Sequence, residues 1–202
     1  AHSEAKNVTN IVLDHHNAAE QALAHLYELG HRRIAFMRGP RAIPDSEYRW
    51  ESIQKVTQNM GMRIDPASVI RIDDAGWSMK SGYHPMAPEI GFKCMQALLQ
   101  KAKGFTAVFC FNDIAAIGAI RALKDAGLSV PGDVSVVGFD DILSAAYSTP
   151  SLTTVRQPLT EMGKQGAKIL LERIGNREKQ FPAKIDVVPE LVVRESTGPV
   201  RS

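Results

Sequence analysis

Short runs of apolar, β-branched-rich residues recur along the chain and are separated by longer amphipathic stretches. The runs cover residues 11–13, 34–37, 69–72, 107–111 and 134–139. Each run is apolar at odd and even positions alike, which is typical of strands in a parallel sheet that helices cover on both faces. We therefore predict that these runs are neighbouring strands of one buried sheet.

The amphipathic stretches between the runs predict helices. Asn17 is a candidate N-cap, with Glu20 three residues later as the reciprocal partner of a capping box. A second helix is predicted to open at Asp45 or Ser46, and Pro158 stands where a first helical turn is expected. The resulting alternation of strands and helices is the signature of a doubly wound α/β fold.

Two parts of the chain break this alternation. Residues 73–88 contain Gly, Ser and Pro without periodicity, which predicts a long loop, and such loops are often functional. Residues 152–156 and 185–194 read as extended, and Pro189 interrupts the second of these stretches. Because proline cannot donate to a central ladder, the two halves of that stretch are candidates for different sheets.

Composition narrows the class of protein. The 202 residues include 24 Lys+Arg and 22 Asp+Glu, so the net charge is +2 and no broad nucleic-acid or membrane surface is indicated. No apolar run approaches the ~18 residues of a membrane span, and the first residues do not resemble a signal peptide. The two cysteines, Cys94 and Cys110, fit a reducing compartment, and we expect a cytoplasmic protein.

Polar residues follow three of the predicted strands. In open parallel sheets ligands bind at the carboxyl ends of the strands, where Asp45 and Arg49, Asn112 and Asp140 are expected. An aspartate accepts hydroxyl hydrogens, an arginine donates and an asparagine does both, so the set suits a neutral polyol. Trp77 in the long loop offers a flat apolar face for a sugar ring or a base.

Structural interpretations of the same residues stay open at this point. Asn112 and Asp140 are also placed to cap the helices that follow them, and Arg49 suits a helix surface. The adjacent pair Asp140 and Asp141 suggests a metal site, although no third ligand is evident. The GxGxxG, GxxxxGK[ST], HExxH and GxSxG motifs are missing, so we expect no enzyme activity, no cofactor and no metal.

Three long segments carry a resemblance to a known family. They read LYELGHRRIAFMRGP, FTAVFCFNDIAAIGAIRALKDAGLSVPGDVSVVGFDDI and TPSLTTVRQPLTEMGKQGAKILLERI, in this order. Together they resemble the effector-binding part of LacI/GalR-family bacterial transcriptional regulators, over nearly the whole chain from Val12 to Ser196. The helix-turn-helix head, the hinge and the opening elements of a complete member are missing, so we expect the sequence to be part of a longer chain.

The resemblance implies a periplasmic-binding-protein-like I fold, with parallel sheets flanked by helices in two lobes and a ligand cleft between them. The C-terminal lobe would be complete and the N-terminal lobe partial. Residues 1–14 would be a fragment of the N-terminal lobe and residues 15–152 the C-terminal lobe. Residues 153–188 would cross over and return to the N-terminal lobe, and residues 189–202 would form the final strand of the C-terminal lobe and a tail.

The resemblance also implies roles for individual residues. Arg49, Asn112 and Asp140 occupy the positions at which the family contacts its effector, and Asp45 falls near another such position. Trp77 matches an aromatic residue that stacks on the effector.

Residues 73–88 are longer than the family's usual connection, so Tyr83 is an alternative to Trp77 for stacking on the effector.

The implied function is ligand sensing in a LacI-family repressor. A small effector, a sugar by preference, would bind in the interlobe cleft and control operator binding allosterically in a homodimer, without a membrane partner. Operator DNA would be contacted only through the missing head. The alternatives are a periplasmic sugar-binding protein of a transport system and a sugar hydrolase that uses Asp140 or Asp141. The identity of the effector and its action as inducer or corepressor stay open.

Overall fold

The chain folds into two sheets of different size. A computed structural model describes residues 8–76, 87–176 and 180–201. The larger sheet has the strand order β3-β2-β4-β5-β6-β8, and all of its neighbours are parallel except β6 and β8. The smaller sheet pairs β1 with β7 in parallel. This arrangement confirms the predicted α/β class with a mostly parallel sheet.

Every predicted strand is present, but the prediction of one sheet is wrong for residues 11–13, which lie in the small sheet and not in the large one. The strands are β1 (Asn10–Leu13), β2 (Ile34–Arg38), β3 (Val69–Arg71), β4 (Ala107–Cys110), β5 (Ser135–Asp140), β6 (Thr153–Arg156), β7 (Lys184–Val187) and β8 (Glu190–Val192). The helices are α1 (His15–Glu28), α2 (Pro44–Asn59), α3 (Pro88–Lys101), α4 (Asp113–Asp125), α5 (Leu143–Tyr147) and α6 (Leu159–Gly175), with the 3₁₀ turns η1 (Pro66–Ser68) and η2 (Ile72–Ala75).

The large sheet is buried on both faces, as the apolar runs predict. In β2, Ile34 and Phe36 point into a core formed with α1 and α2, whereas Ala35 and Met37 point into a core formed with α3 and α4. Successive strand residues alternate between faces, so a strand that is covered on both sides must be apolar throughout. Two helical layers therefore enclose the sheet and hold its strand ends in fixed positions.

The first helix begins earlier than the capping pattern predicts. Asp14, and not Asn17, is the N-cap of α1, because its Oδ1 accepts the backbone N–H of Asn17 at 2.9 Å. Asn17 instead accepts a hydrogen bond from the side chain of Gln21. The second helix likewise begins at Pro44, one residue before Asp45. Asp14 is a competing cap three residues before Asn17, whereas Pro44 is suited to the first turn of α2 although Ile43 before it makes no side-chain capping bond.

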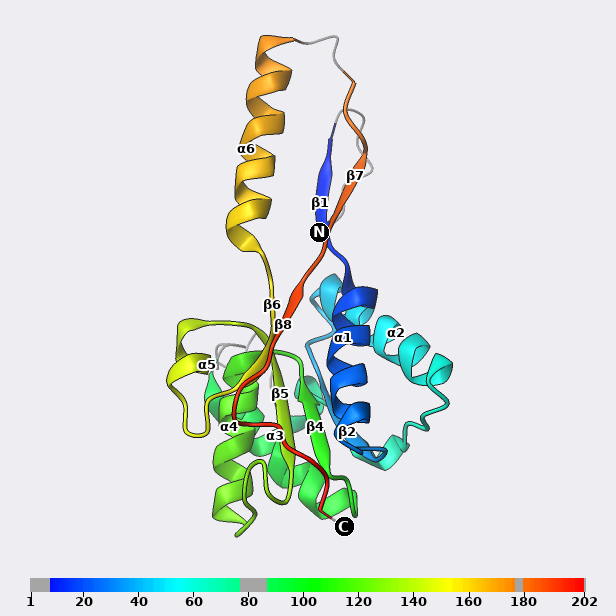
Figure 1. Cartoon of the computed structure of the whole chain (residues 1–202), viewed down its shortest axis with the longest axis vertical. Helices are drawn as coiled ribbons and strands as arrows, with labels where there is room; N and C mark the ends of the chain where they lie inside the picture. The colour runs from blue at the N-terminus through cyan, green and yellow to red at the C-terminus, as the bar shows by residue number, and fades with distance from the viewer. Residues whose placement is uncertain (1–7, 77–86, 177–179, 202) are drawn as a thin grey trace.

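Pro189 divides the last extended stretch between the two sheets, as predicted. β7 pairs with β1, and β8 pairs with β6 in the large sheet. In Figure 1, β1, β7 and α6 lie together at one end of the molecule, and the helix-covered large sheet lies at the other. The connections that leave β6 and enter β8 run between these two parts, so both cross the boundary.

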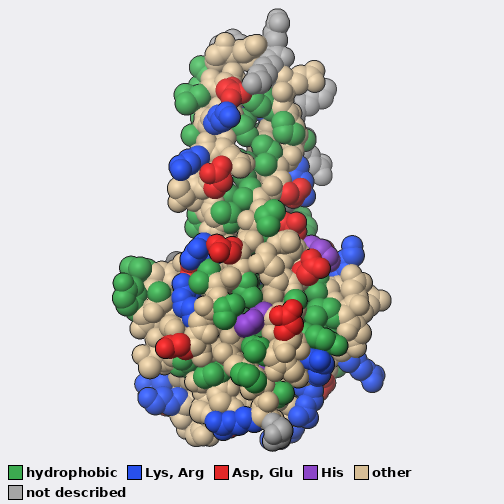
Figure 2. Space-filling model, in the orientation of Figure 1, with side chains coloured by type: hydrophobic (Ala, Val, Ile, Leu, Met, Phe, Trp, Pro, Cys, Tyr) green, Lys and Arg blue, Asp and Glu red, His purple; other side chains and the backbone are tan. Residues whose placement is uncertain are grey.

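The face shown in Figure 2 carries both signs of charge. Acidic and basic side chains are mixed over its upper and middle parts, in keeping with the net charge of +2. Within the described ranges, none of the helices combines the length and the hydropathy that crossing a membrane requires.

Candidate functional site

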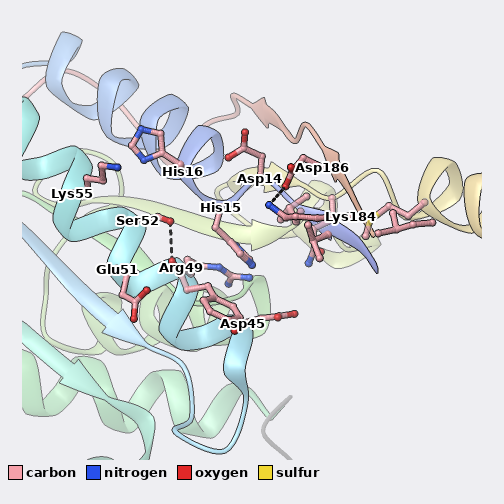
Figure 3. Close-up of a pocket in the computed structure, with 16 residues that line it drawn as sticks. Asp14, His15, His16, Asp45, Arg49, Glu51, Ser52, Lys55, Lys184 and Asp186 are labelled. Carbon is pink, nitrogen blue, oxygen red and sulfur yellow. Dashed lines mark hydrogen bonds and ion pairs between the residues drawn. The ribbon is translucent and has the colours of Figure 1, made fainter. Parts of the chain in front are cut away.

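An open cleft of about 560 Å³ lies between the small sheet and helix α2 of the larger part. Its walls come from β1, the start of α1, residues 45–55 of α2, the segment after β6, the first turn of α6, and β7 (Figure 3). The lining residues are Ile11, Val12, Leu13, Asp14, His15, His16, Asp45, Tyr48, Arg49, Glu51, Ser52, Lys55, Gln157, Met162, Lys184 and Asp186. A ligand in this cleft would therefore contact both parts of the molecule.

Arg49 is the most constrained charged group of the cleft. Its Nη1 donates to the backbone carbonyl of Phe111, and its Cζ lies 3.3 Å from the centroid of the Phe139 ring. Its buried Nε has no hydrogen-bond partner among the described residues. Burial lowers the pKa of Arg49 to about 10, against the opposing charge of Asp140, Asp45 and Asp113. The guanidinium stays protonated at neutral pH and has donor capacity left for a ligand.

Asp140 lies beside the cleft at the carboxyl end of β5. Its Oδ1 accepts a hydrogen bond of 2.5 Å from Nε2 of Gln157, which lines the cleft. Burial raises the pKa of Asp140, and the charge of Arg49 and the hydrogen bond from Gln157 oppose that rise. Its φ of 112° places the residue in a backbone region that non-glycine residues rarely occupy.

Acidic and basic groups balance each other along the cleft. Asp45, in the first turn of α2, is exposed and close enough to oppose the pKa shift of Arg49. Lys184 and Asp186 of β7 form an ion pair of 2.5 Å across one edge (Figure 3). The remaining charged lining residues also include both signs, so the cleft is polar without a concentration of positive charge.

Asn112 serves as a helix cap. Its Oδ1 accepts the N–H of Ala115 at 2.8 Å, and the side chain is buried at the N-terminus of α4. It follows Phe111, whose carbonyl holds Arg49, but it does not line the cleft. Of the capping and ligand-binding roles that the sequence left open for Asn112, the structure shows the cap.

Asp141, the second aspartate of the GFDD motif (residues 138–141), is already hydrogen-bonded to two arginines. Asp141 accepts from Arg156 at 2.7 Å and from Arg194 at 2.6 Å. Burial raises the pKa of Asp141, but these hydrogen bonds outweigh it and hold the pKa below its usual range. Among the described residues no three His, Cys, Asp or Glu side chains gather as a metal site. Asp141 therefore has a structural role at the crossing strands.

The structure brings three of the five predicted site residues to one place. Arg49 and Asp45 line the cleft. Asp140 lies beside it, because its carboxyl group accepts a hydrogen bond from the lining residue Gln157 and is close enough to Arg49 for that charge to act on its pKa. Trp77 lies outside the described residues, as does its alternative Tyr83. Contact of any of these residues with a ligand stays a prediction.

Four residues that line the cleft were not predicted from the sequence. His15, His16, Gln157 and Lys184 all line it, and the ring of His15 lies 6.4 Å from that of Phe139. The strand-end rule could have identified His15 and His16, because they follow β1 directly. Lys184 had no such signal, since its place depends on the pairing of β7 with β1, in which its partner Asn10 lies 174 residues earlier in the chain.

The comparisons with known proteins settle the family. A model of the periplasmic binding protein-like domain matches residues 23–197. The chain belongs to the periplasmic binding protein-like domain family. Within this family it is 36% identical to the HTH-type transcriptional repressor PurR of Haemophilus influenzae over 194 residues, which is 94% of this chain and 54% of PurR. The chain thus spans about half the length of this relative.

Solved structures of LacI-family proteins share the fold of this periplasmic binding protein-like domain. A LacI family transcriptional regulator from Enterococcus faecium with bound ribose is 29% identical, with a TM-score of 0.80, over 98% of this chain and 69% of that one. The dimeric Lac repressor with an 11-residue C-terminal deletion is 25% identical, with a TM-score of 0.83, over 98% of this chain and 67% of that one. The resemblance to LacI-family regulators is confirmed.

Proposed function

We propose that this periplasmic binding protein-like domain senses a small neutral polyhydroxyl ligand, a sugar, for a LacI-family transcriptional repressor. The observation that carries the proposal is the cleft itself, which joins both parts of the molecule and has Arg49 on its wall and Asp140 beside it, bonded to the lining residue Gln157. The relatives support the regulatory role, and the ribose-bound neighbour supports the ligand class.

The chemistry of the cleft favours hydroxyl groups over phosphate. Arg49 supplies donors that are held in place by Phe111 and Phe139, and Asp140 supplies acceptors beside it. A sugar hydroxyl donates to one and accepts from the other. A phosphate would instead meet the carboxylates of Asp45 and Asp186 at short range, without a surplus of cationic side chains to offset them.

The mechanism that we infer is allosteric and not catalytic. We assign residues 1–14 and 153–188 to one lobe and residues 15–152 and 189–202 to the other. A ligand between them would favour one lobe arrangement by its difference in affinity for the two. In the whole protein, an intracellular homodimer, that arrangement would set the spacing of DNA-binding heads, as palindromic operators require. Effector binding would involve no cofactor and no operator contact by this domain.

A thermal-shift screen tests the ligand class. The chain is heated with neutral sugars (ribose among them), sugar phosphates and nucleobases, and hits are titrated by calorimetry. We expect a saturable rise in melting temperature with a neutral sugar, because a ligand that binds only the folded state stabilises it. Arg49→Met should abolish this rise, whereas Arg121→Met, on the exposed face of α4, should leave it intact.

Three results would overturn parts of the proposal. Stabilisation by a phosphate or a nucleobase alone would exclude the neutral-sugar ligand but keep the sensing role. Full binding of a sugar by the Arg49→Met variant would exclude the cleft as the site. Release of a chromogenic leaving group from glycosides by the chain would contradict the non-catalytic role.

A further inference from the structure

The turn that presents Asp140 has an unusual backbone. Asp140 and Asp141 both have positive φ angles, 112° and 56°, although neither is glycine. Side chains make this region unfavourable, so such residues persist only where the surrounding structure holds them. The groups that hold residues 140–142 therefore determine where the carboxylate of Asp140 points.

Asp113 is a buried residue whose side chain is hydrogen-bonded to this turn. It is fully buried in the first turn of α4, and its Oδ2 accepts the backbone N–H of Ile142 at 2.9 Å. Its Oδ1 accepts the hydroxyl of Thr154, on β6, at 2.5 Å. One side chain thus joins a helix terminus, the turn after β5 and a strand that leads toward α6.

The neighbouring strand leaves space for this carboxyl group. Gly138 pairs with Thr154 in the sheet, two residues before Asp140. A Cβ on Gly138 would overlap Oδ1 of Asp113 and lie 2.8 Å from Cδ2 of Leu152. Glycine is therefore required at this position for Asp113 to bond to both of its partners. The first residue of the GFDD motif (residues 138–141) thus leaves the space that the Asp113 carboxyl group occupies.

We propose that Asp113 is a positioning residue that fixes the turn at residues 140–142 and thereby aims Asp140 at the cleft. The consequence for ligand affinity rests on the proposed function, but the effect on the turn does not. Asp113 does not line the cleft, so it acts through the Ile142 N–H and not by touching a ligand. The bond to Thr154 is a second bond of the same carboxyl group, and the positioning role does not depend on it.

Three variants of the full 202-residue chain separate positioning from stability. Asp113→Ala removes the acceptor for Ile142. Asp113→Asn removes the charge but keeps an amide oxygen that can accept the same N–H. Thr154→Val is the matched control, because it removes the other bond of the same carboxyl group and leaves the Ile142 bond in place.

The first readout needs no ligand. Carbon-13 NMR of the side-chain carboxyl group follows the titration of Asp140, and hydrogen exchange follows the amide of Ile142. In Asp113→Ala we expect faster exchange at Ile142 and a fall in the pKa of Asp140 toward its ordinary value, because the released carboxylate meets water. Asp113→Asn and Thr154→Val should retain the protected amide and the raised pKa of Asp140. The second readout is ribose affinity by calorimetry, with about tenfold weaker binding expected for Asp113→Ala alone.

The outcomes distinguish the two proposals. If Asp113→Ala leaves both the exchange at Ile142 and the titration of Asp140 unchanged, the positioning role is wrong, whatever ribose does. If Thr154→Val changes both as strongly as Asp113→Ala, the role is also wrong, because the effect is then general loosening. If the NMR changes appear as expected and wild-type chain binds no ribose, positioning stands and only ribose as the ligand fails. If Asp113→Ala does not fold, hydrogen exchange at the Ile142 amide is compared between Asp113→Asn and wild type. Loss of Ile142 protection in Asp113→Asn refutes the proposal.

Discussion

Replacing Gly138 by alanine should disturb the folded state far more than the added methyl group suggests. Gly138 is buried in β5, and its backbone is of the kind that any residue adopts in a strand. The new Cβ would overlap Oδ1 of Asp113 and approach Cδ2 of Leu152 to 2.8 Å. Because neither neighbour lies at a flexible surface, the Asp113 carboxyl group must move away from Ile142 and Thr154.

The size of the effect follows from two contributions. Adding a methyl group to a packed interior costs roughly 1–3 kcal/mol. Leaving the buried N–H of Ile142 or the hydroxyl of Thr154 without its acceptor costs about 1–3 kcal/mol more. Together the loss is about 2–6 kcal/mol, which is a large share of the roughly 5–15 kcal/mol that stabilises a typical domain.

Urea unfolding monitored by circular dichroism measures this loss. The matched control is Gly163→Ala in α6, where a Cβ would meet no heavy atom within 4 Å in the described part of the chain. That substitution should raise the free energy of unfolding by about 0.5–1 kcal/mol through helix propensity. Equal unfolding midpoints for wild type and Gly138→Ala would refute the packing argument and, with it, the link between Gly138 and Asp113.

Three further predictions concern charge and reactivity. Burial raises the pKa of Asp113 from 3.8 to about 7, with Asp140 and Asp141 adding to the rise. The folded chain thus holds a proton between about pH 4 and 7 that the unfolded chain has released. This contribution to stability is present at low pH and is lost as pH rises through 7, by up to about 4 kcal/mol. Asp113→Asn should flatten that part of a stability profile measured by urea unfolding, and an unchanged slope would contradict the assignment. Arg194→Met should cost about 2 kcal/mol in the same assay, since it removes a largely buried ion pair with Asp141, whereas the exposed Arg121→Met should cost no more than about 0.5 kcal/mol. Burial raises the pKa of Cys94 to about 12 and raises that of Cys110 well above its ordinary value, so iodoacetamide at pH 8 should label both only after denaturation, as mass spectrometry would show.

Much of the fold could be predicted from the sequence because both faces of the sheet are buried. A strand such as β4 then consists of apolar residues alone, Ala107 to Cys110, and short apolar runs of this kind are visible without any partner. Helix starts were less predictable. Asp14 and Asn17 are both good caps, and the choice between them depends on where β1 ends.

The candidate site was predictable only in part. Arg49, Asp45 and Asp140 follow strands of one sheet, so the strand-end rule places them together. Lys184 and Gln157 come from the small sheet and its connection, and their positions depend on pairings between distant segments. Asn112 shows a further limit, because a residue placed after a strand is equally suited to cap the helix that follows.

Chemical-shift mapping tests the central claim most directly. The nitrogen-15-labelled chain is titrated with the compound that stabilises it most in the thermal-shift screen. We predict saturable shifts in both parts of the molecule, at Asp45, Arg49 and His15 of the larger part together with Lys184 of the small sheet and Gln157 of the segment that leads to it. Saturable shifts confined to one part, or to residues remote from this cleft, would contradict the claim that a small ligand bridges the two parts of the molecule.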